Sequence, residues 1–224
     1  MLPGVFEKRF EVKRAVIMLG GTICNYEYTK RLILKDDIII CADGGLMHLK
    51  KMGIVPHVWI GDNDSCTIGA DEFHSLTKDS EIIKLNPIKD STDGDVAYDY
   101  VCKNKFDEVL VLGYFGVRLD HVLANIILLK KFADINIKAS AVNENNTVIF
   151  ARKHNEIAAG EYKYLSVVPL SSEITGVSND GLFYTLSDDI LSRYSSRGIS
   201  NKPISDRCII DIKKGDALII LSKD

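Results

Sequence analysis

Carboxylates beside Gly, Ser or Thr recur in this 224-residue chain where apolar runs stop. Four such acidic segments and a fifth, less acidic one occupy residues 41–45, 61–65, 89–95, 118–121 and 198–201. Open α/β sheets bind ligands at the carboxyl ends of their strands, so we expect these side chains to converge there. Converging carboxylates need a cation, and their hard oxygens suit Mg²⁺, which usually binds together with phosphates. The sequence therefore predicts a magnesium-dependent enzyme that acts on a nucleotide.

Asp62 and Asp64 are two residues apart in one of these segments. If extended geometry continues through Asn63, both side chains point to one face, where they could hold one Mg²⁺. An Asp-rich turn without any ligand is the competing interpretation of the same spacing.

Thr92 and Asp95 have the spacing of a capping box, which predicts that a helix begins at Thr92. Capping accounts for Asp95, but it does not account for the further acids Asp90 and Asp93. The free amides of this helix end, together with Thr92, could instead meet a phosphate. Both interpretations stay open at this point.

Arg118, Asp120 and His121 follow the glycines of another predicted strand end. The planar guanidinium of Arg118 suits phosphate oxygens, and Asp120 is a candidate metal ligand or proton acceptor. Alternatively, Arg118 and Asp120 form a surface pair that serves only local stability. Asp43 precedes Gly44-Gly45 at a further strand end, where glycine lets a ligand approach the backbone closely.

The composition excludes several classes of protein. The net charge is −3 and no basic run occurs, so we expect no nucleic-acid binding. The five cysteines form no CxxC pair, which argues against a zinc site or a disulfide framework and fits a reducing cytoplasm. No apolar segment has the length of a signal-peptide core or a membrane span, so we expect a soluble, cytoplasmic protein without membrane partners.

Strands and helices alternate through the first part of the chain. Buried strands are predicted at 12–19, 37–42, 58–60, 81–85 and 108–112, and helices at 45–51, 92–103 and 119–132. This order predicts a doubly wound, mainly parallel sheet. After about residue 137, short β-like runs between turns predict an all-β sandwich. The predicted domains are an α/β nucleotide-binding domain over 1–150 and a β-sandwich domain over 151–224.

Several of these runs occur in the same order in the thiamine pyrophosphokinases. They are Ala42-Asp43-Gly44-Gly45, Ile60-Gly61-Asp62-Asn63-Asp64-Ser65, Lys89-Asp90-Ser91-Thr92-Asp93, Arg118-Leu119-Asp120-His121-Val122-Leu123-Ala124-Asn125 and Gly198-Ile199-Ser200-Asn201. The chain resembles this family from roughly residue 12 to its C-terminus. The family's fold, an α/β nucleotide domain followed by a β-sandwich, agrees with the change of sequence pattern near residue 137.

The resemblance implies a reaction and a set of residue roles. The reaction is Mg²⁺-dependent transfer of diphosphate from ATP to the thiamine hydroxyl, giving thiamine diphosphate and AMP. The implied metal ligands are Asp62, Asp64 and Asp93, and the implied catalytic residues are Asp93, Arg118 and Asp120. The implied ATP and phosphate ligands are Asp43, Thr92, Arg118 and His121, and the implied thiamine ligands are Ser200 and Asn201. The family also implies a homodimer with thiamine between the subunits.

Two alternatives accompany this hypothesis. Thr185 and Lys202 depart from the family's usual residues on the thiamine side, so the same transfer onto a hydroxymethyl pterin is one alternative. A catalytically silent nucleotide-binding sensor is the other, although the acids and the arginine that a silent protein would be expected to lack are present.

Overall fold

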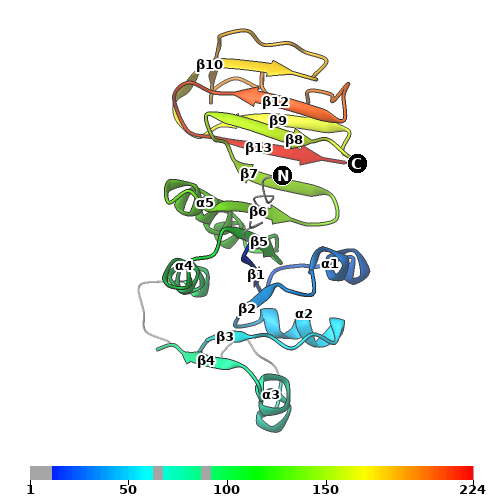
Figure 1. Ribbon diagram of the computed structural model, residues 1–224, viewed down its shortest axis with the longest axis vertical. Helices are drawn as coiled ribbons and strands as arrows, with labels where there is room; N and C mark the ends of the chain where they lie inside the picture. Colours follow the sequence, from blue (N-terminus) through cyan, green and yellow to red (C-terminus); the bar gives the residue numbers. More distant parts are fainter. Residues whose placement is uncertain (1–11, 63–67, 87–91, 224) are drawn as a thin grey trace, which may run out of the picture.

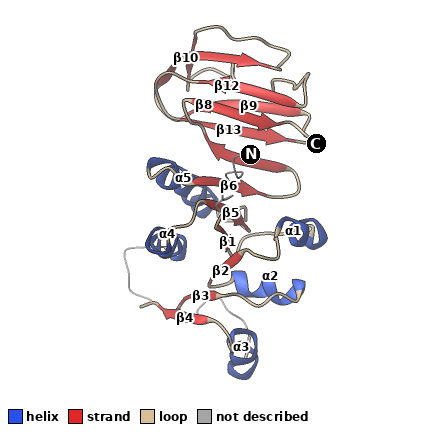
Figure 2. Ribbon diagram, in the orientation of Figure 1, coloured by secondary structure: helices blue, strands red, loops and turns tan. Residues whose placement is uncertain are grey.

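A computed structural model describes residues 12–62, 68–86 and 92–223. A nine-stranded sheet runs the length of the described structure, and a four-stranded sheet packs against one end of it (Figure 1, Figure 2). The strand order is β4-β3-β2-β1-β5-β6-β7-β13-β9 in the large sheet and β11-β10-β12-β8 in the small one. Asp64 and Asp90, two acids of the predicted site, lie outside the described residues.

The first six strands are parallel to one another. They are β1 (Arg14–Met18), β2 (Ile38–Ala42), β3 (Val58–Gly61), β4 (Glu81–Lys84), β5 (Glu108–Leu112) and β6 (Lys138–Val142). The chain builds outward from β1 to β4 and then returns to place β5 on the other side of β1. The switch point of the sheet therefore lies between the carboxyl ends of β1 and β5, which is where such sheets bind ligands.

Helices cover both faces of this parallel part. They are α1 (Tyr26–Leu32), α2 (Gly45–Met52), α3 (Ala70–Thr77), α4 (Asp93–Asn104) and α5 (Leu119–Asp134). Ala15 and Ile17 of β1 pack into the core with α4 and α5, whereas Val16 and Met18 pack into the core with α1, α2 and α3 (Figure 1). Burial on both faces explains why the strands are apolar along their whole length.

Antiparallel strands build the C-terminal part. β7 (Asn146–Phe150), β13 (Ala217–Ser222) and β9 (Tyr164–Pro169) extend the large sheet. The small sheet consists of β8 (His154–Ala158), β10 (Glu173–Asp180), β11 (Asp189–Ser192) and β12 (Arg207–Asp211). Their facing apolar side chains form one core, which includes Leu165, Ile174, Cys208, Ile210, Ile219 and Leu221. The predicted combination of a mainly parallel α/β sheet with a β-sandwich is confirmed. The large sheet continues across residue 150, and a domain boundary there stays a prediction.

The predicted strands and helices of the α/β part are all present, but α1 and α3 were not predicted. Both are short, and each buries a single side chain, Thr29 in α1 and Thr77 in α3. Helices of seven and eight residues are too short for an apolar pattern to repeat clearly in the sequence. Within the part of the chain described, none of the helices has the length and apolar character that a membrane crossing needs.

Candidate active site

A cleft of about 870 Å³ opens at the carboxyl ends of β1, β2, β3 and β5. It therefore lies at the switch point of the sheet. The predicted site residues that line it are Asp43, Asp62, Thr92, Asp93, Arg118, Asp120 and His121. These residues come from four separate loops and helix starts, and the fold brings them together as predicted.

Glycines let the loops after β1, β2 and β5 pack closely together at one wall of this cleft. A Cβ on Gly45 would overlap the carbonyl of Met18, and a Cβ on Gly21 would overlap the carbonyls of Gly113 and Phe115. The Gly21 amide donates to the Gly113 carbonyl at 2.9 Å, which joins the loops after β1 and β5. Backbone rather than side chains therefore forms this wall, and a ligand can approach it closely.

Asp43 joins the ends of β2 and β3. Its backbone is left-handed (φ 37°), and its amide donates to the Ile60 carbonyl at 2.7 Å. The side chain is buried and lies against Gly61, since a Cβ there would be 2.8 Å from Asp43 Oδ1. This carboxylate is therefore beside the residue that precedes Asp62.

Thr92 and Asp95 form the capping box at the start of α4. Thr92 Oγ1 accepts from the Asp95 amide at 3.2 Å, and the Thr92 amide donates to Asp95 Oδ2 at 3.1 Å. Burial raises the pKa of the Asp95 carboxyl, but hydrogen bonds from Lys131 and Thr92 outweigh it and lower that pKa. Capping therefore accounts for Thr92 and Asp95, while Asp93 in the same turn lines the cleft.

Arg118 and Asp120 form an ion pair at the start of α5. Arg118 Nη2 lies 2.6 Å from Asp120 Oδ2, and both side chains are exposed. The hydrogen bond raises the pKa of Arg118 and lowers the pKa of Asp120. Asp120 is thus a poor proton acceptor while it is paired. The pair also lines the cleft, so it is placed for more than local stability.

The donor set of the cleft fits a divalent cation. Asp62 and Asp93 both line it, and carboxylate oxygens are the ligands that Mg²⁺ prefers. Asp64, the third predicted ligand, lies outside the described residues. Among residues 12–62, 68–86 and 92–223, no three His, Cys, Asp or Glu side chains gather closely enough to hold a metal by themselves.

Ser200 and Asn201 lie away from the cleft, in the β-sandwich. Asn201 pairs with Leu165 of β9, and its side chain is engaged with the backbone of Tyr184 and Lys202. The Ser200 amide donates to Ser166 Oγ at 2.9 Å, and its own side chain is exposed. These two predicted thiamine ligands are therefore not brought together with the residues of the cleft within one chain.

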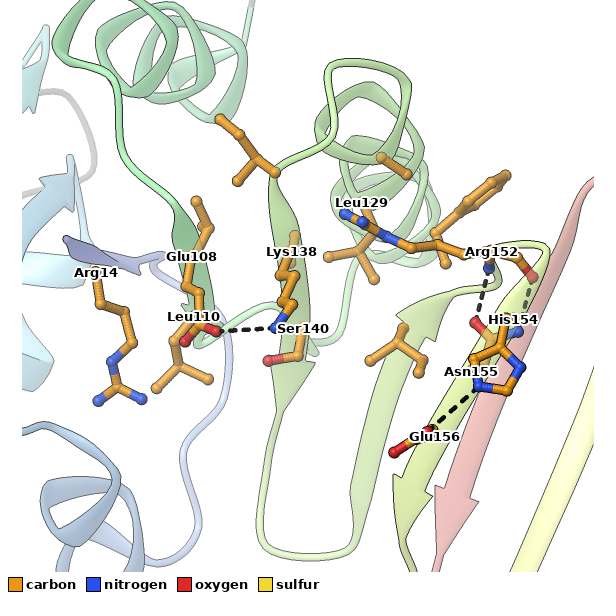
Figure 3. A pocket seen from close by; sticks show the side chains of 16 residues that line it. Arg14, Glu108, Leu110, Leu129, Lys138, Ser140, Arg152, His154, Asn155 and Glu156 are labelled. Carbon is orange, nitrogen blue, oxygen red and sulfur yellow. Dashed lines mark hydrogen bonds and ion pairs between the residues drawn. The ribbon is translucent and has the colours of Figure 1, made fainter. Parts of the chain in front are cut away.

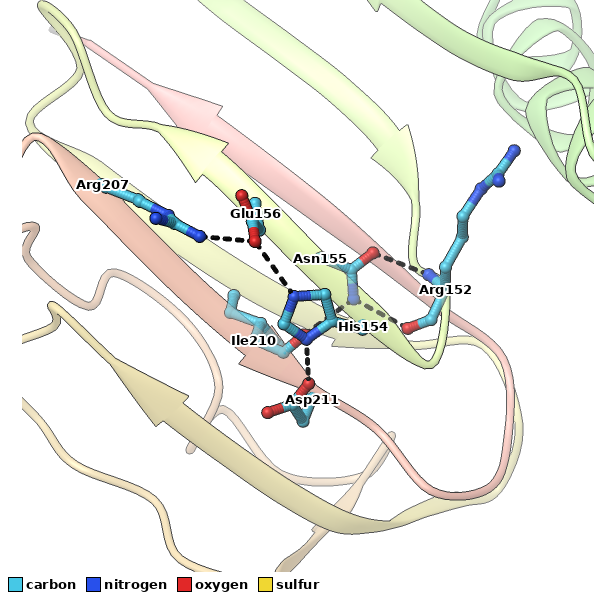
Figure 4. A network of polar contacts seen from close by, with 7 residues as sticks. All are labelled: Arg152, His154, Asn155, Glu156, Arg207, Ile210 and Asp211. Atoms are coloured by element: carbon cyan, nitrogen blue, oxygen red, sulfur yellow. Dashed lines mark hydrogen bonds and ion pairs between the residues drawn. The ribbon is translucent and has the colours of Figure 1, made fainter.

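A second cavity, of about 570 Å³, lies near the amino ends of β1, β5 and β6, away from the cleft (Figure 3). Glu108 and Lys138, the first residues of β5 and β6, pair across it at 3.6 Å. Its β8 side belongs to a polar network in which buried Asn155 bonds to the backbone of Arg152 and Ile210 (Figure 4). None of the predicted site residues that the structure describes lines this cavity.

Comparison with known proteins separates the α/β part of the chain from the β-sandwich part. A family model described as thiamin pyrophosphokinase, catalytic domain, matches residues 29–140, and one described as thiamin pyrophosphokinase, vitamin B1 binding domain, matches residues 147–218. The chain belongs to the thiamin pyrophosphokinase family. The catalytic-domain match spans the residues that line the cleft from Ala42 to Asn125, and the binding-domain match contains Ser200 and Asn201.

Individual thiamine pyrophosphokinases are similar over most of the chain. The Bacillus subtilis thiamine pyrophosphokinase is 32% identical over 188 residues, which cover 83% of this chain and 87% of that protein. A crystal structure of the Bacillus subtilis enzyme has a TM-score of 0.85 at 27% identity, covering 95% of this chain and 100% of that one. The yeast enzyme, at 17% identity, shares the fold with a TM-score of 0.73, covering 97% of this chain and 88% of its own. These matches lend no support to a pterin kinase or a silent sensor.

His48 also lines the cleft, but the sequence analysis did not identify it. His48 Nε2 lies 2.6 Å from the Gly21 carbonyl, and Nδ1 lies 2.8 Å from the Tyr26 hydroxyl. The residue is half-buried, and this burial lowers the pKa of the imidazole. No motif surrounds His48 in the sequence, and its partner Gly21 is 27 residues away, so only the fold reveals the contact.

Proposed function

We propose that this chain transfers an intact diphosphate from ATP to the hydroxyl of thiamine, giving thiamine diphosphate and AMP in a Mg²⁺-dependent reaction. The observation that carries the proposal is the gathering of Asp62, Asp93 and Arg118 in one cleft at the switch point of the sheet. Membership of the thiamin pyrophosphokinase family supports the choice of both substrates.

Asp62 and Asp93, together with Asp64, would hold the Mg²⁺. Bound there, the cation would offset the negative charge of the triphosphate. Asp43 would position Asp62, because its amide bonds to Ile60 and its side chain lies against Gly61, the last residue of β3 before Asp62. The backbone wall at Gly20 and Gly21 leaves room for a ligand.

Arg118 has two partners in turn under this proposal. In the free enzyme its fork faces Asp120. When ATP binds, the guanidinium turns to the phosphate oxygens, where charge increases as the diphosphate moves. Release from Arg118 returns the pKa of Asp120 toward its ordinary value, so Asp120 becomes a better acceptor for the thiamine hydroxyl proton.

Ser200 and Asn201 would contact thiamine across a homodimer. β9 lies four strands beyond β5, which at the usual strand spacing is about 19 Å, so one chain cannot bring Asn201 to its own cleft. A partner subunit could supply them. Exposed apolar side chains support such an interface: Phe183, Tyr184 and Ile199 surround this stretch, and Leu119, Leu123 and Ile127 form a stripe on α5 beside the cleft.

We also propose that the enzyme works in the cytoplasm. The cysteines that the structure describes, Cys24, Cys41, Cys102 and Cys208, are all free thiols, as expected in a reducing compartment.

A substrate panel tests the proposal. Purified protein is incubated with ATP and either thiamine or a hydroxymethyl pterin, with Mg²⁺ or with EDTA, and the products are separated by chromatography. We expect AMP and thiamine diphosphate only with thiamine and only with the metal. Turnover of the pterin alone would contradict the proposed acceptor, and turnover in EDTA would contradict the metal requirement.

A further inference from the structure

We infer that His48 is a positioning residue, which fixes the Gly21–Thr22 segment and through it the loop that carries Arg118. His48 lies in the first turn of α2, while Gly21 follows β1 and Tyr26 begins α1. One imidazole, which itself lines the cleft, thus connects three elements at its wall. The inference rests on the proposed function, because it assigns the contact with ATP to the Arg118 loop.

The hydrogen bonds of His48 define its protonation. The Gly21 carbonyl can only accept, so Nε2 carries a proton and donates across 2.6 Å. In the neutral ring Nδ1 then accepts from the Tyr26 hydroxyl, 2.8 Å away. Burial lowers the pKa of His48 and favours this neutral form. Tyr26 thereby selects the tautomer that holds Gly21.

Gly21 passes this restraint to the loop after β5. The Gly21 amide donates to the Gly113 carbonyl, and the Thr22 amide donates to the Phe115 carbonyl. Gly116 packs directly on Gly21, since a Cβ on Gly116 would lie 3.4 Å from Gly21 Cα. Arg118 follows two residues later. A displaced Gly21 would therefore move the segment from which Arg118 reaches the cleft.

Two substitutions at the same position separate this role from packing. His48→Gln keeps a donor near the place of Nε2, whereas His48→Asn keeps a polar group only near Nδ1 and loses the bond to Gly21. We expect His48→Asn to lower kcat/KM for ATP about tenfold, the usual consequence of a small misplacement of a reacting group, and His48→Gln to stay within about threefold of the wild type. The KM for thiamine should change by less than about twofold in both, since this loop is on the ATP side.

Thermal unfolding of the same proteins is the control. A merely structural role predicts that both variants lose stability and activity together, without rescue by Gln, and that result would overturn the inference. Unchanged kcat/KM in His48→Asn would overturn it as well.

If the wild-type protein forms no thiamine diphosphate, the proposed function fails, and calorimetric titration with ATP and Mg²⁺ then tests His48. Weaker ATP binding by His48→Asn than by His48→Gln supports the positioning role. Equal affinities, or no ATP binding by the wild type, contradict it.

Discussion

Asp93 lies in the first turn of α4, one residue after the cap, and it lines the cleft. Its neighbours Thr92 and Asp95 satisfy the helix end without it. Asp93 can therefore serve the site, and its removal should affect chemistry far more than folding.

We predict that Asp93→Asn lowers kcat about 100-fold or more. A neutral amide is a much poorer ligand for Mg²⁺ than a carboxylate, and it does not balance the positive charge of the cation. The free energy of unfolding should fall by no more than about 1 kcal/mol, the usual contribution of a carboxylate at a helix start. Steady-state kinetics and urea unfolding measure the two effects. Asp99→Asn, an exposed change in the same helix, is the matched control, and equal activity of the two variants would exclude Asp93 from the site.

Arg118 tests whether a planar fork is needed. Arg118→Lys keeps the positive charge but offers phosphate oxygens a single ammonium group, so we expect kcat/KM for ATP to fall at least about tenfold. Arg207→Lys alters a comparable exposed ion pair, with Glu156, on the far sheet and should leave the rate unchanged. Equal rates for Arg118→Lys and the wild type would mean that the Arg118–Asp120 pair serves only local stability.

The residues of the site could be predicted from the sequence more easily than the contacts that hold their loops in place. Asp43, Asp62, Asp93 and Asp120 stand where strands end or helices begin, and that placement is visible in the sequence. The contact of His48 with Gly21 spans two loops whose approach depends on glycine packing, so no local pattern indicates it.

At the scale of elements, the long apolar strands and amphipathic helices followed from periodicity, and the capping box at Thr92 followed from spacing. α1 escaped prediction because its stability comes from a local cap, Asn25 Oδ1 accepting from the Tyr28 amide, and from packing on α2. Continuation of the large sheet from β6 into β7 and β13 could not be predicted either, because β7 and β13 pair across about 70 residues of sequence.

The pairing of β8 with β12 carries a pH-dependent contribution to stability. His154 Nδ1 lies 2.7 Å from Asp211 Oδ1, and Nε2 lies 3.4 Å from Glu156 Oε1 (Figure 4). Asp211, and then Glu156, raise the pKa of His154 above its ordinary value of 6.5. The folded state therefore favours the charged ring, so this stabilisation is full below the unfolded pKa and is lost as pH rises through the folded pKa.

We predict that the difference in thermal midpoint between the wild type and His154→Gln is larger at pH 6 than at pH 8.5. The control is the same comparison in the Asp211→Asn background, which removes the nearest partner of His154 and should make the difference vary less with pH. A difference in thermal midpoint that increases toward alkaline pH would contradict this prediction.

In the proposed homodimer, the cleft of one chain and the β-sandwich of the other together form each active site. Asp93→Asn should remove a metal ligand from the cleft, and Ser200→Arg should block the thiamine contact on the β-sandwich. Each variant alone should therefore have little activity. In a mixed dimer, one of the two sites would combine an intact cleft with an intact sandwich. We predict that unfolding and refolding the two variants together restores about a quarter of the wild-type rate, since half of randomly paired dimers are mixed and each has one good site. No restoration, with mixed dimers demonstrated by mass spectrometry, would mean that each chain completes its own site.

The proposed reaction moves an intact diphosphate from ATP to thiamine in the cleft. Phosphorus NMR of the wild-type protein with ATP, Mg²⁺ and thiamine follows every phosphate of the reaction in one sample. We predict that AMP and thiamine diphosphate increase in equal amounts, with no ADP and no thiamine monophosphate at any time. The appearance of ADP together with thiamine monophosphate would contradict it.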